Sequence, residues 1–188
     1  MSEMSDRYVN ALEELDRHVH AIGDDQWALP TPCTDWDVRA LIDHLVYETL
    51  WVPDLVQGKT LEEVGDSYDG ERLGEDPVGA WEKAASAAID AMGIEGATEG
   101  MVHTSGGEVP SDEYIGQMLV DAVIHGWDLA QSIGVDHHVD THTASDLLVW
   151  FGPQAEAMQR YGAMAAPVEV PGDADDLTRL IALSGRTP

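Results

Sequence analysis

The sequence predicts a mainly all-α fold, and three observations support this prediction. Apolar residues recur every three or four positions in several segments of helical length, which is the repeat of amphipathic α-helices. Only one short segment, residues 102–104, suggests β-structure, in the form of a ribbon within a loop. The 188 residues, 44% of them hydrophobic, suffice for one well-buried core and require no second one. We therefore expect a single helical domain over residues 1–188.

The first helix is expected from Ser5 to Ile22, where the apolar residues follow a helical repeat. His18 and His20 lie near its C-terminal end, where cationic side chains suit the helix dipole, and both are expected to be solvated. The next stretch contains two prolines one residue apart, which hold the chain extended. Trp27 and Leu29 are therefore expected to pack as a strap over the end of the bundle.

The second helix is expected from about Asp35 to Val52. Thr34 and Asp37 have the spacing of a capping box, with Asp in place of the usual Glu, and are expected to open this helix. Pro53 is expected to end or kink it, because proline lacks the N–H that an interior helical position donates. The stripe expected to face the core comprises Val38, Leu41, Ile42, Leu45, Thr49 and Val52.

The remaining helices follow the same repeat, and the segments between them are irregular. Pro77 stands at a first helical turn. Residues 58–76 are expected to form an ordered connection with no chemistry of its own, and residues 94–110 a long loop that includes the ribbon. Helices are expected over Val78 to Met92, Ser111 to Ile133 and Thr143 to Tyr161, with a last helix docked by Leu177, Leu180 and Ile181.

The helix over residues 111–133 carries the strongest functional signal. It is apolar almost all round, but one narrow strip is polar and titratable. A surface helix normally carries its polar residues opposite an apolar stripe, so a polar strip on an apolar helix is expected to face inward. At about 100° per residue, an arc of about 80° contains Tyr114, Met118, Asp121, His125, Asp128 and Ser132.

Asp121 and His125 lie one helical turn apart on this strip, which is a common way to begin a metal site. Buried carboxylates and imidazoles are costly unless they are paired or bind a metal. The same spacing is also typical of a hydrogen-bonded or solvated pair, so a third ligand from another part of the chain is needed to favour a metal site. His44 is the best-placed partner, at the margin of the second helix's apolar stripe with Glu48 one turn further on. The alternative for His44 is a boundary residue without function.

Other residues are weaker candidates for chemistry. His137, His138 and His142 lie in a short polar segment, which is either a surface metal site or a polar turn. A polar turn is favoured, because loop ligands without a scaffold make a poor site. Cys33 is the single cysteine, so an internal disulfide is excluded and a reducing compartment fits. It is either a fourth ligand or nucleophile, or a buried residue without such a role.

The charge is strongly negative, with 36 acidic residues against 9 basic ones and a net charge of −27. This charge repels nucleic acid and anionic membranes, so we expect neither as a partner. No apolar run approaches the roughly 18 residues of a membrane span, and the N-terminus is too polar for a signal peptide. We expect a cytoplasmic monomer or homodimer. The spread of the acids fits a solvated surface in high salt or the bias of a GC-rich genome.

Three segments carry a resemblance to a known family. The first runs from Trp27 to Leu45 and includes Pro-Thr-Pro-Cys-Thr-Asp-Trp-Asp-Val-Arg. The second is Asp121-Ala-Val-Ile-His125-Gly-Trp-Asp-Leu-Ala, and the third is Pro-Val-Glu-Val-Pro followed by Arg-Leu-Ile-Ala-Leu-Ser-Gly-Arg. Together they resemble the DinB-like metal-binding proteins, which are similar to the N-terminal domain of mycothiol-dependent maleylpyruvate isomerase.

The resemblance implies a DinB-like four-helix bundle, here with an extra C-terminal helix. It also implies a divalent metal, usually zinc, held by a histidine of the second helix and two residues four apart on the fourth. His44, Asp121 and His125 stand at the matching positions. The isomerase has Glu in place of Asp121, and the shorter Asp must approach the metal more closely. Nickel or another divalent ion is therefore an alternative to zinc. The sequence also ends without the isomerase's C-terminal domain, so its substrate is not carried over.

Two imidazoles and one carboxylate leave positions open for water or substrate, which is the pattern of catalytic zinc. Such a zinc lowers the pKa of bound water to about 7 or stabilises a bound thiolate. Asp128 and Glu48 are candidates to orient His125 and His44, with capping or surface carboxylates as the alternative.

Three functions are compatible with these features. The first is a metal-dependent enzyme, by resemblance a transferase or isomerase that uses a low-molecular-weight thiol as cosubstrate and acts on a small molecule. The second is a non-catalytic protein that binds a metal or a small molecule. The third is a structural bundle without metal, in which the polar strip is a hydrogen-bonded network.

Overall fold

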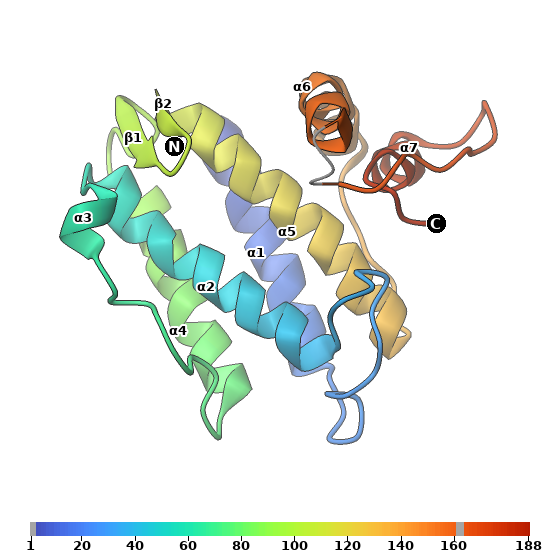
Figure 1. The fold of residues 1–188 in the computed structure, drawn as a ribbon, viewed down its shortest axis with the longest axis horizontal. Coiled ribbons are helices and arrows are strands. Elements are labelled where there is room, and N and C mark those ends of the chain that lie inside the picture. The colour runs from blue at the N-terminus through green and yellow to red at the C-terminus, as the bar shows by residue number, and fades with distance from the viewer. Residues whose placement is uncertain (1–2, 161–163) are drawn as a thin grey trace.

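The protein is described here from a computed structural model, which describes residues 3–160 and 164–188. In these ranges the chain forms seven helices and one antiparallel hairpin, so the mainly all-α prediction is confirmed (Figure 1). None of these helices is long and apolar enough to cross a membrane. The elements are α1 (Glu3–His20), α2 (Val38–Val56), α3 (Leu61–Val64), α4 (Pro77–Met92), β1 (Met101–Thr104), β2 (Gly107–Pro110), α5 (Ser111–Ile133), α6 (Thr141–Arg160) and α7 (Asp176–Leu183).

Four helices form the predicted bundle. Helix α1 packs against α4 and α5, and α2 packs against the same two helices from the other side, so the four enclose a common core (Figure 1). The apolar stripes predicted from the sequence face this core, because burial of one stripe per helix is what stabilises an amphipathic helix. Fully buried side chains include Leu12, Leu15, Leu41, Ile42, Trp81, Leu119 and Leu129.

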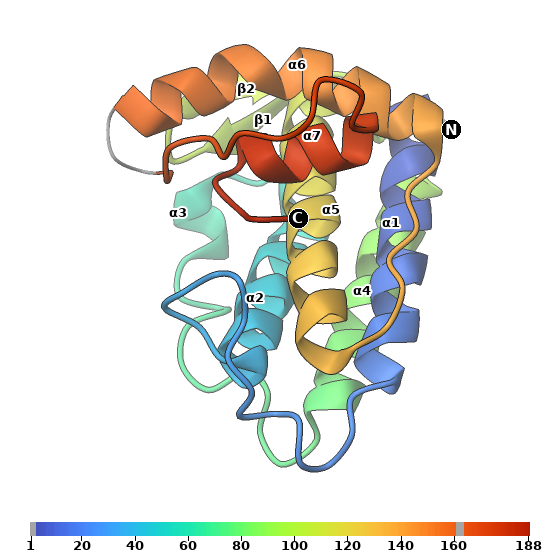
Figure 2. The same cartoon turned by 90° about the vertical axis from the view of Figure 1, so that its right-hand side faces the viewer.

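Helices α6 and α7 add a second layer beside α5. Figure 2 shows α6 running across one end of the bundle with α7 beneath it. The C-terminal helix is docked as predicted, since Leu180 and Ile181 are fully buried and Leu177 packs against the core. The extended piece before it is joined to it by a hydrogen bond from Val168 N–H to the Ala182 carbonyl. The predicted end of α6, at Tyr161, lies outside the described residues.

The start of α2 differs from the prediction. Asp37 itself is the N-cap, and its carboxylate accepts a hydrogen bond from the Ala40 N–H at 2.8 Å. The expected capping box of Thr34 and Asp37 is therefore wrong, because Thr34 lies in the preceding turn. The helix also begins at Val38 rather than Asp35. An aspartate satisfies free N–H groups as well as threonine does, so the spacing alone could not decide between them.

The end of α2 also lies beyond the predicted one. The helix continues through Pro53 to Val56, so the proline does not end it at Val52. Both Val52 and Leu55 are buried in the core. Tertiary packing of the last turn therefore outweighs the hydrogen bond that the proline cannot make.

The segment before α2 forms a strap that folds back on itself through turns at residues 24–28 and 34–35, so it is not extended throughout as predicted. Backbone N–H groups of Val38 and Arg39 donate to the carbonyls of Leu29 and Trp27, at 3.0 and 2.9 Å. The side chains of Trp27 and Leu29 pack against the core, which confirms their predicted role. The turn of this strap holds Trp36 beside α2 and α5.

The two long connections contain short regular elements. Strands β1 and β2 form the expected ribbon, with Val102 paired with Val109 and fully buried. Within residues 58–76 the chain forms the single-turn helix α3, which was not predicted. A reciprocal capping box of Thr60 and Glu63 opens this helix.

Candidate metal centre

The three predicted ligands meet between α2 and α5. His44 lies on α2, and Asp121 and His125 lie one turn apart on α5. The Nε2 atom of His44 is 3.3 Å from Oδ1 of Asp121, and Nε2 of His125 is 3.5 Å from the same oxygen. The two ring centroids are 5.0 Å apart. One potential ligand atom from each residue lies within 4.8 Å of the other two.

The polar strip of α5 faces inward, as predicted. His125 is only 8% exposed, and Asp128 is completely buried. Asp121 and His44 are partly buried and border the cavity described below. The strip is therefore enclosed by the protein without being sealed from small molecules.

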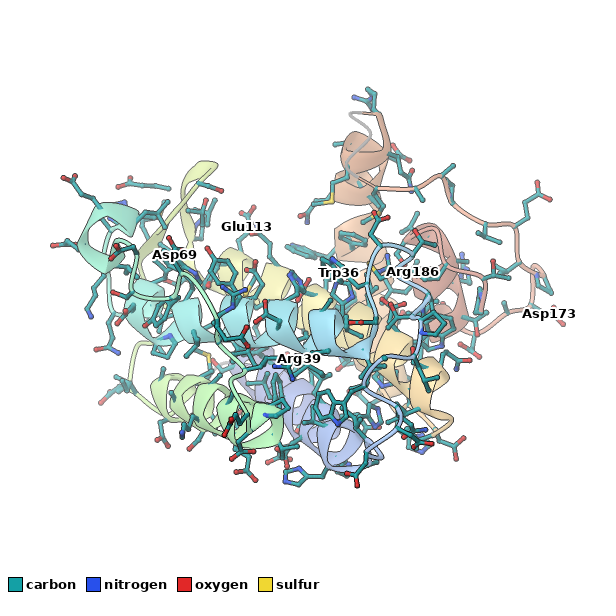
Figure 3. The ribbon with its side chains drawn as sticks, turned by 60° about the horizontal axis from the view of Figure 1, so that its bottom comes forward. Trp36, Arg39, Asp69, Glu113, Asp173 and Arg186 are labelled. Carbon is teal, nitrogen blue, oxygen red and sulfur yellow. The ribbon has the colours of Figure 1, made fainter. Side chains whose placement is uncertain are left out.

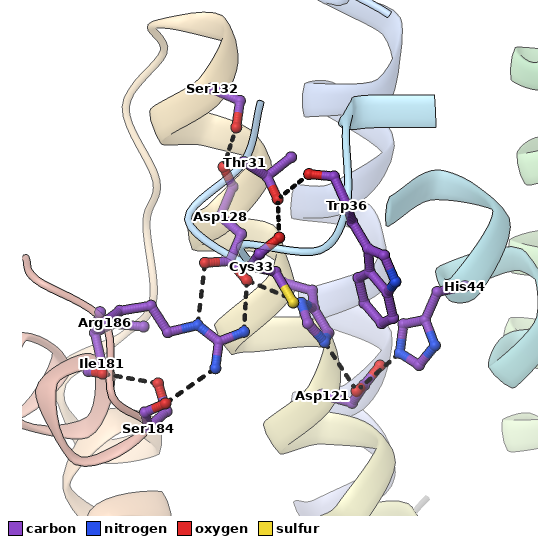
Figure 4. Close-up of polar contacts among 11 residues, drawn as sticks. Thr31, Cys33, Trp36, His44, Asp121, Asp128, Ser132, Ile181, Ser184 and Arg186 are labelled. Carbon is purple, nitrogen blue, oxygen red and sulfur yellow. Dashed lines mark hydrogen bonds and ion pairs between the residues drawn. The ribbon is translucent and has the colours of Figure 1, made fainter. Parts of the chain in front are cut away.

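Asp128 fixes the orientation of His125. The Nδ1–H of His125 donates to Oδ2 of Asp128 at 2.9 Å, which turns Nε2 of the same ring toward Asp121. Figure 4 shows Asp128 with the contacts of its carboxylate, including those to Arg186. A carboxylate behind the ring is the usual way in which proteins hold a metal-binding histidine in one tautomer. This contact agrees with the role that the sequence suggested for Asp128.

Two contributors to the site were missed, one of them, Arg186, 58 positions from its partner Asp128. Arg186 donates from Nε and Nη2 to both oxygens of Asp128, at 3.2 and 2.8 Å. Trp36 covers the other side, with its ring centroid 4.6 Å from that of His44 and 5.4 Å from that of His125. Figure 3 shows Trp36 and Arg186 on the same side of the molecule. Both residues stand in the motifs that carry the family resemblance, but those motifs assigned neither residue a role.

The electrostatics keep both carboxylates ionised. Burial alone would raise the pKa of Asp121, but the nearby His125 and the hydrogen bond with His44 outweigh it and lower that pKa. Burial likewise acts to raise the pKa of Asp128, and the contacts with His125 and Arg186 lower it. For His44, burial lowers the pKa, whereas the hydrogen bond to Asp121 raises it above its ordinary value. Negative charge is thus concentrated where a cation would sit.

Glu48 does not orient His44 by a hydrogen bond among the described residues. It lies one turn from His44 along α2 and borders the same cavity. Burial and the nearby charge of Asp121 raise its pKa. A raised pKa means that Glu48 holds a proton more readily than an ordinary glutamate, and no hydrogen bond to His44 supports its predicted orienting role.

Cys33 lies on the Asp128 side of the site. Its sulfur is within 4.8 Å of one potential ligand atom of His125 and one of Asp128. Burial raises the pKa of this thiol above its ordinary value. A neutral thiol is a weak ligand and a weak nucleophile, so the environment of Cys33 favours neither of the reactive roles considered from the sequence.

A cavity of about 390 Å³ opens beside the three residues. The α2 and α5 side chains of the site form one wall, and α6 forms the opposite wall. The lining combines aromatic and thioether groups with a few polar groups, which is typical of small-molecule sites. Lining residues include Glu48, Met118, Trp150, Phe151, Met158 and Arg186.

Comparison with known proteins identifies the family. Residues 9–130 match the family model described as the mycothiol maleylpyruvate isomerase N-terminal domain. The chain belongs to this family. Two uncharacterized proteins, from two strains of Mycobacterium tuberculosis, are each 28% identical to it over 171 residues, covering 87% of this chain and 86% of theirs. A crystal structure of mutant mycothiol-dependent maleylpyruvate isomerase shares the fold, with a TM-score of 0.58 at 15% identity over 81% of this chain and 71% of that chain.

The family match confirms the resemblance found from the sequence. The matched residues include His44, Asp121 and His125, whereas Arg186 and helices α6 and α7 lie beyond them. This member of the isomerase family therefore builds one wall of the cavity, and the support behind Asp128, from segments outside the matched region.

A second group of residues able to hold a metal ion corrects two predictions. His18 was expected to be solvated, but it is only 4% exposed. Its Nε2 lies 3.1 Å from Nδ1 of His137, which was expected to belong to a surface turn. Glu14 completes the group, with one ligand atom from each residue within 4.8 Å of the others. The sequence could not reveal the group, because His137 is 119 positions from His18.

Proposed function

We propose that His44, Asp121 and His125 hold a divalent cation, with zinc as the first choice and nickel as the alternative. The convergence of two imidazole nitrogens on one carboxylate oxygen, at 3.3 and 3.5 Å, carries this proposal. Zinc binds imidazole and carboxylate at about 2.0–2.2 Å, so atoms this close to one another need little movement to share an ion. The donor set therefore fits a borderline cation of the zinc class.

Each neighbouring residue has a defined part in this proposal. Asp128 holds His125 in the tautomer that leaves Nε2 free, and Arg186 holds Asp128. Trp36 limits the access of water to the two imidazoles. The bound cation would supply Lewis acidity at a position open to the cavity, where it lowers the pKa of a water or thiol.

The proposed activity is that of a metal-dependent enzyme, a transferase or isomerase that uses a low-molecular-weight thiol. The family is named for a mycothiol-dependent maleylpyruvate isomerase, and the cavity beside the three residues has the size of a small-molecule site. Asp121 and Arg186 both line this cavity, so it offers charges of both signs beside its apolar walls to a ligand that reaches the cation. The substrate is a small molecule whose identity the lining does not specify.

Two alternatives belong to other functional classes. A protein that binds a metal and a small molecule without turnover would use the same residues and the same cavity. A structural bundle would instead use the polar strip as a hydrogen-bonded network, which the contacts from His44 to Arg186 would also satisfy. Metal content separates the structural bundle from the other two, and turnover separates the enzyme from the binding protein.

The direct test of the thiol-dependent proposal uses protein loaded with cobalt(II), a spectroscopic substitute for zinc. Addition of a low-molecular-weight thiol is expected to produce the intense near-ultraviolet absorption of a thiolate bound to cobalt. His44→Ala is expected to lose this response. Thiol-dependent isomerisation of maleylpyruvate is then measured with the zinc protein. An absent spectral response would contradict thiol use, and a response without turnover would favour the binding protein.

A further inference from the structure

Glu14, His18 and His137 form a polar cluster on the face of α1 away from the candidate metal centre. Glu14 and His18 lie one turn apart on α1, and His137 comes from the segment that joins α5 to α6. Figure 2 shows this segment passing beside α1. Nε2 of His18 is 3.1 Å from Nδ1 of His137 and 3.6 Å from Oε1 of Glu14. Both Glu14 and His18 are 4% exposed.

The two carboxylate oxygens of Glu14 have different surroundings. Oε2 forms an ion pair with Arg17, which occupies the solvent side. Oε1 accepts a hydrogen bond from the His138 N–H at 2.9 Å and faces His18. These contacts lower the pKa of Glu14 against the opposing effect of burial. An ionised oxygen with a free lone pair is therefore directed at the two imidazoles.

The two histidines direct ring nitrogens at each other, and only one proton fits between these atoms. The other ring nitrogen of His137, Nε2, is buried and has no hydrogen-bond partner among the described residues. Burial acts against the charged form of both rings and lowers the pKa of each. Neutral imidazoles are the form that binds metals.

The backbone around the cluster leaves room for the His137 ring and for an ion. A Cβ atom at Gly126 would lie 2.9 Å from Cε1 of His137, so glycine on α5 lets the ring approach this closely. A cavity of about 50 Å³ borders Glu14 and His137. His18 does not line this cavity, so the cavity lies beside the three donors and leaves space for a water molecule next to a bound ion.

We propose that Glu14, His18 and His137 bind a second divalent cation of the zinc class. The donors repeat those of the first centre: a carboxylate and an imidazole four residues apart on one helix, with a second imidazole from another element. The ion would fasten the connection between α5 and α6 to α1. This inference does not depend on the first centre binding a metal, because the two groups share no residue.

The test is zinc stoichiometry of the untagged full-length protein, measured by equilibrium dialysis and elemental analysis. Wild type is expected to bind about two ions per chain, and His137→Asn about one. His138→Ala is the matched control, because its side chain is exposed and outside the cluster, and it should keep both ions. If His137→Asn binds as much zinc as wild type, the proposal is wrong. If the first centre binds no metal, the result is a different one: His44→Ala then binds as much zinc as wild type.

A second measurement covers the case in which His137→Asn folds poorly. In a His44→Ala background, zinc is expected to raise the melting temperature through the second site alone, since ligands that bind only the folded state stabilise it. Adding Gly126→Ala should reduce this shift, because the new methyl group displaces the His137 ring without removing a donor. A zinc-induced shift that is unchanged by Gly126→Ala, or absent from His44→Ala, would contradict the proposed site.

Discussion

Asp128 joins the candidate metal centre to the C-terminal segment. Its two oxygens receive the Nδ1–H of His125 on one side and the guanidinium of Arg186 on the other, and the carboxylate has no solvent exposure. A buried ion pair contributes to stability mainly through the cost of breaking it, because the remaining charge is left without a partner. The same residue therefore both supports the proposed ligand His125 and attaches the tail.

Substitution separates these two roles. Asp128→Asn is expected to lower metal affinity by about ten- to a hundredfold, because the hydrogen bond behind His125 is weakened. Arg186→Met is the matched control, since it keeps the contact between Asp128 and His125. Both variants should lower the free energy of unfolding, by roughly 3 kcal/mol, whereas Asp128→Asn should lose more zinc affinity than Arg186→Met, because only Asp128 touches His125. Isothermal titration with zinc measures this difference. If Asp128→Asn binds zinc as tightly as Arg186→Met does, Asp128 only attaches the tail and does not support the metal centre.

The residues of the site differ in how far the sequence could predict them. Asp121, His125 and Asp128 lie on one helix, so helical periodicity alone brings them to one face. His44 could be paired with them because it stands at the margin of a recognisable apolar stripe. Arg186 and Trp36 reach the site through loops, whose course no local periodicity encodes. Their contacts depend on how the strap and the tail return to the bundle.

At the scale of the elements, helix bodies were predicted better than helix ends. The apolar stripes of α2 and α5 correctly predicted which face of each helix is buried, since a helical repeat fixes which residues share a side. The ends depend on which side chain reaches a free N–H and on whether the last turn finds a core to pack against. Asp37 and Pro53 are the two positions where these local choices differ from the prediction.

The cap of α2 can be tested with one pair of variants. Asp37→Ala is expected to lower the free energy of unfolding by about 1 kcal/mol, because it removes the acceptor for the Ala40 N–H. Thr34→Ala is the control, since its side chain is exposed and caps nothing in the described structure. Urea unfolding curves give both values. A larger loss from Thr34→Ala than from Asp37→Ala would restore the capping box inferred from the sequence.

At the scale of the whole molecule, the closure of the bundle brings together the residues of the two proposed metal sites. Each of the two groups combines a carboxylate and histidine of one helix with a histidine from a different element. Sequence spacing revealed the pair of Asp121 and His125 in the first group, but only the fold brings in the histidine from the other element in each group. This is why the pair of Glu14 and His18 gave no signal until His137 was placed beside it.

The net charge of −27 acts on the whole molecule as well. Such a charge raises the local concentration of cations around the protein and repels anions. It therefore favours occupancy of both metal-binding groups, and it makes nonspecific binding at exposed carboxylates a background that experiments must control. Matched variants that alter one buried ligand at a time provide that control.

The zinc content of His44→Ala tests whether the first centre holds a metal. His44 is the only donor from α2, and its loss leaves Asp121 and His125 alone on α5. The single variant His137→Asn lacks one donor of the second cluster, so it is expected to carry about one zinc per chain, bound at the first centre. Adding His44→Ala should remove most of it while the helical circular dichroism stays nearly unchanged. Equal zinc content with and without His44 would contradict the proposed centre.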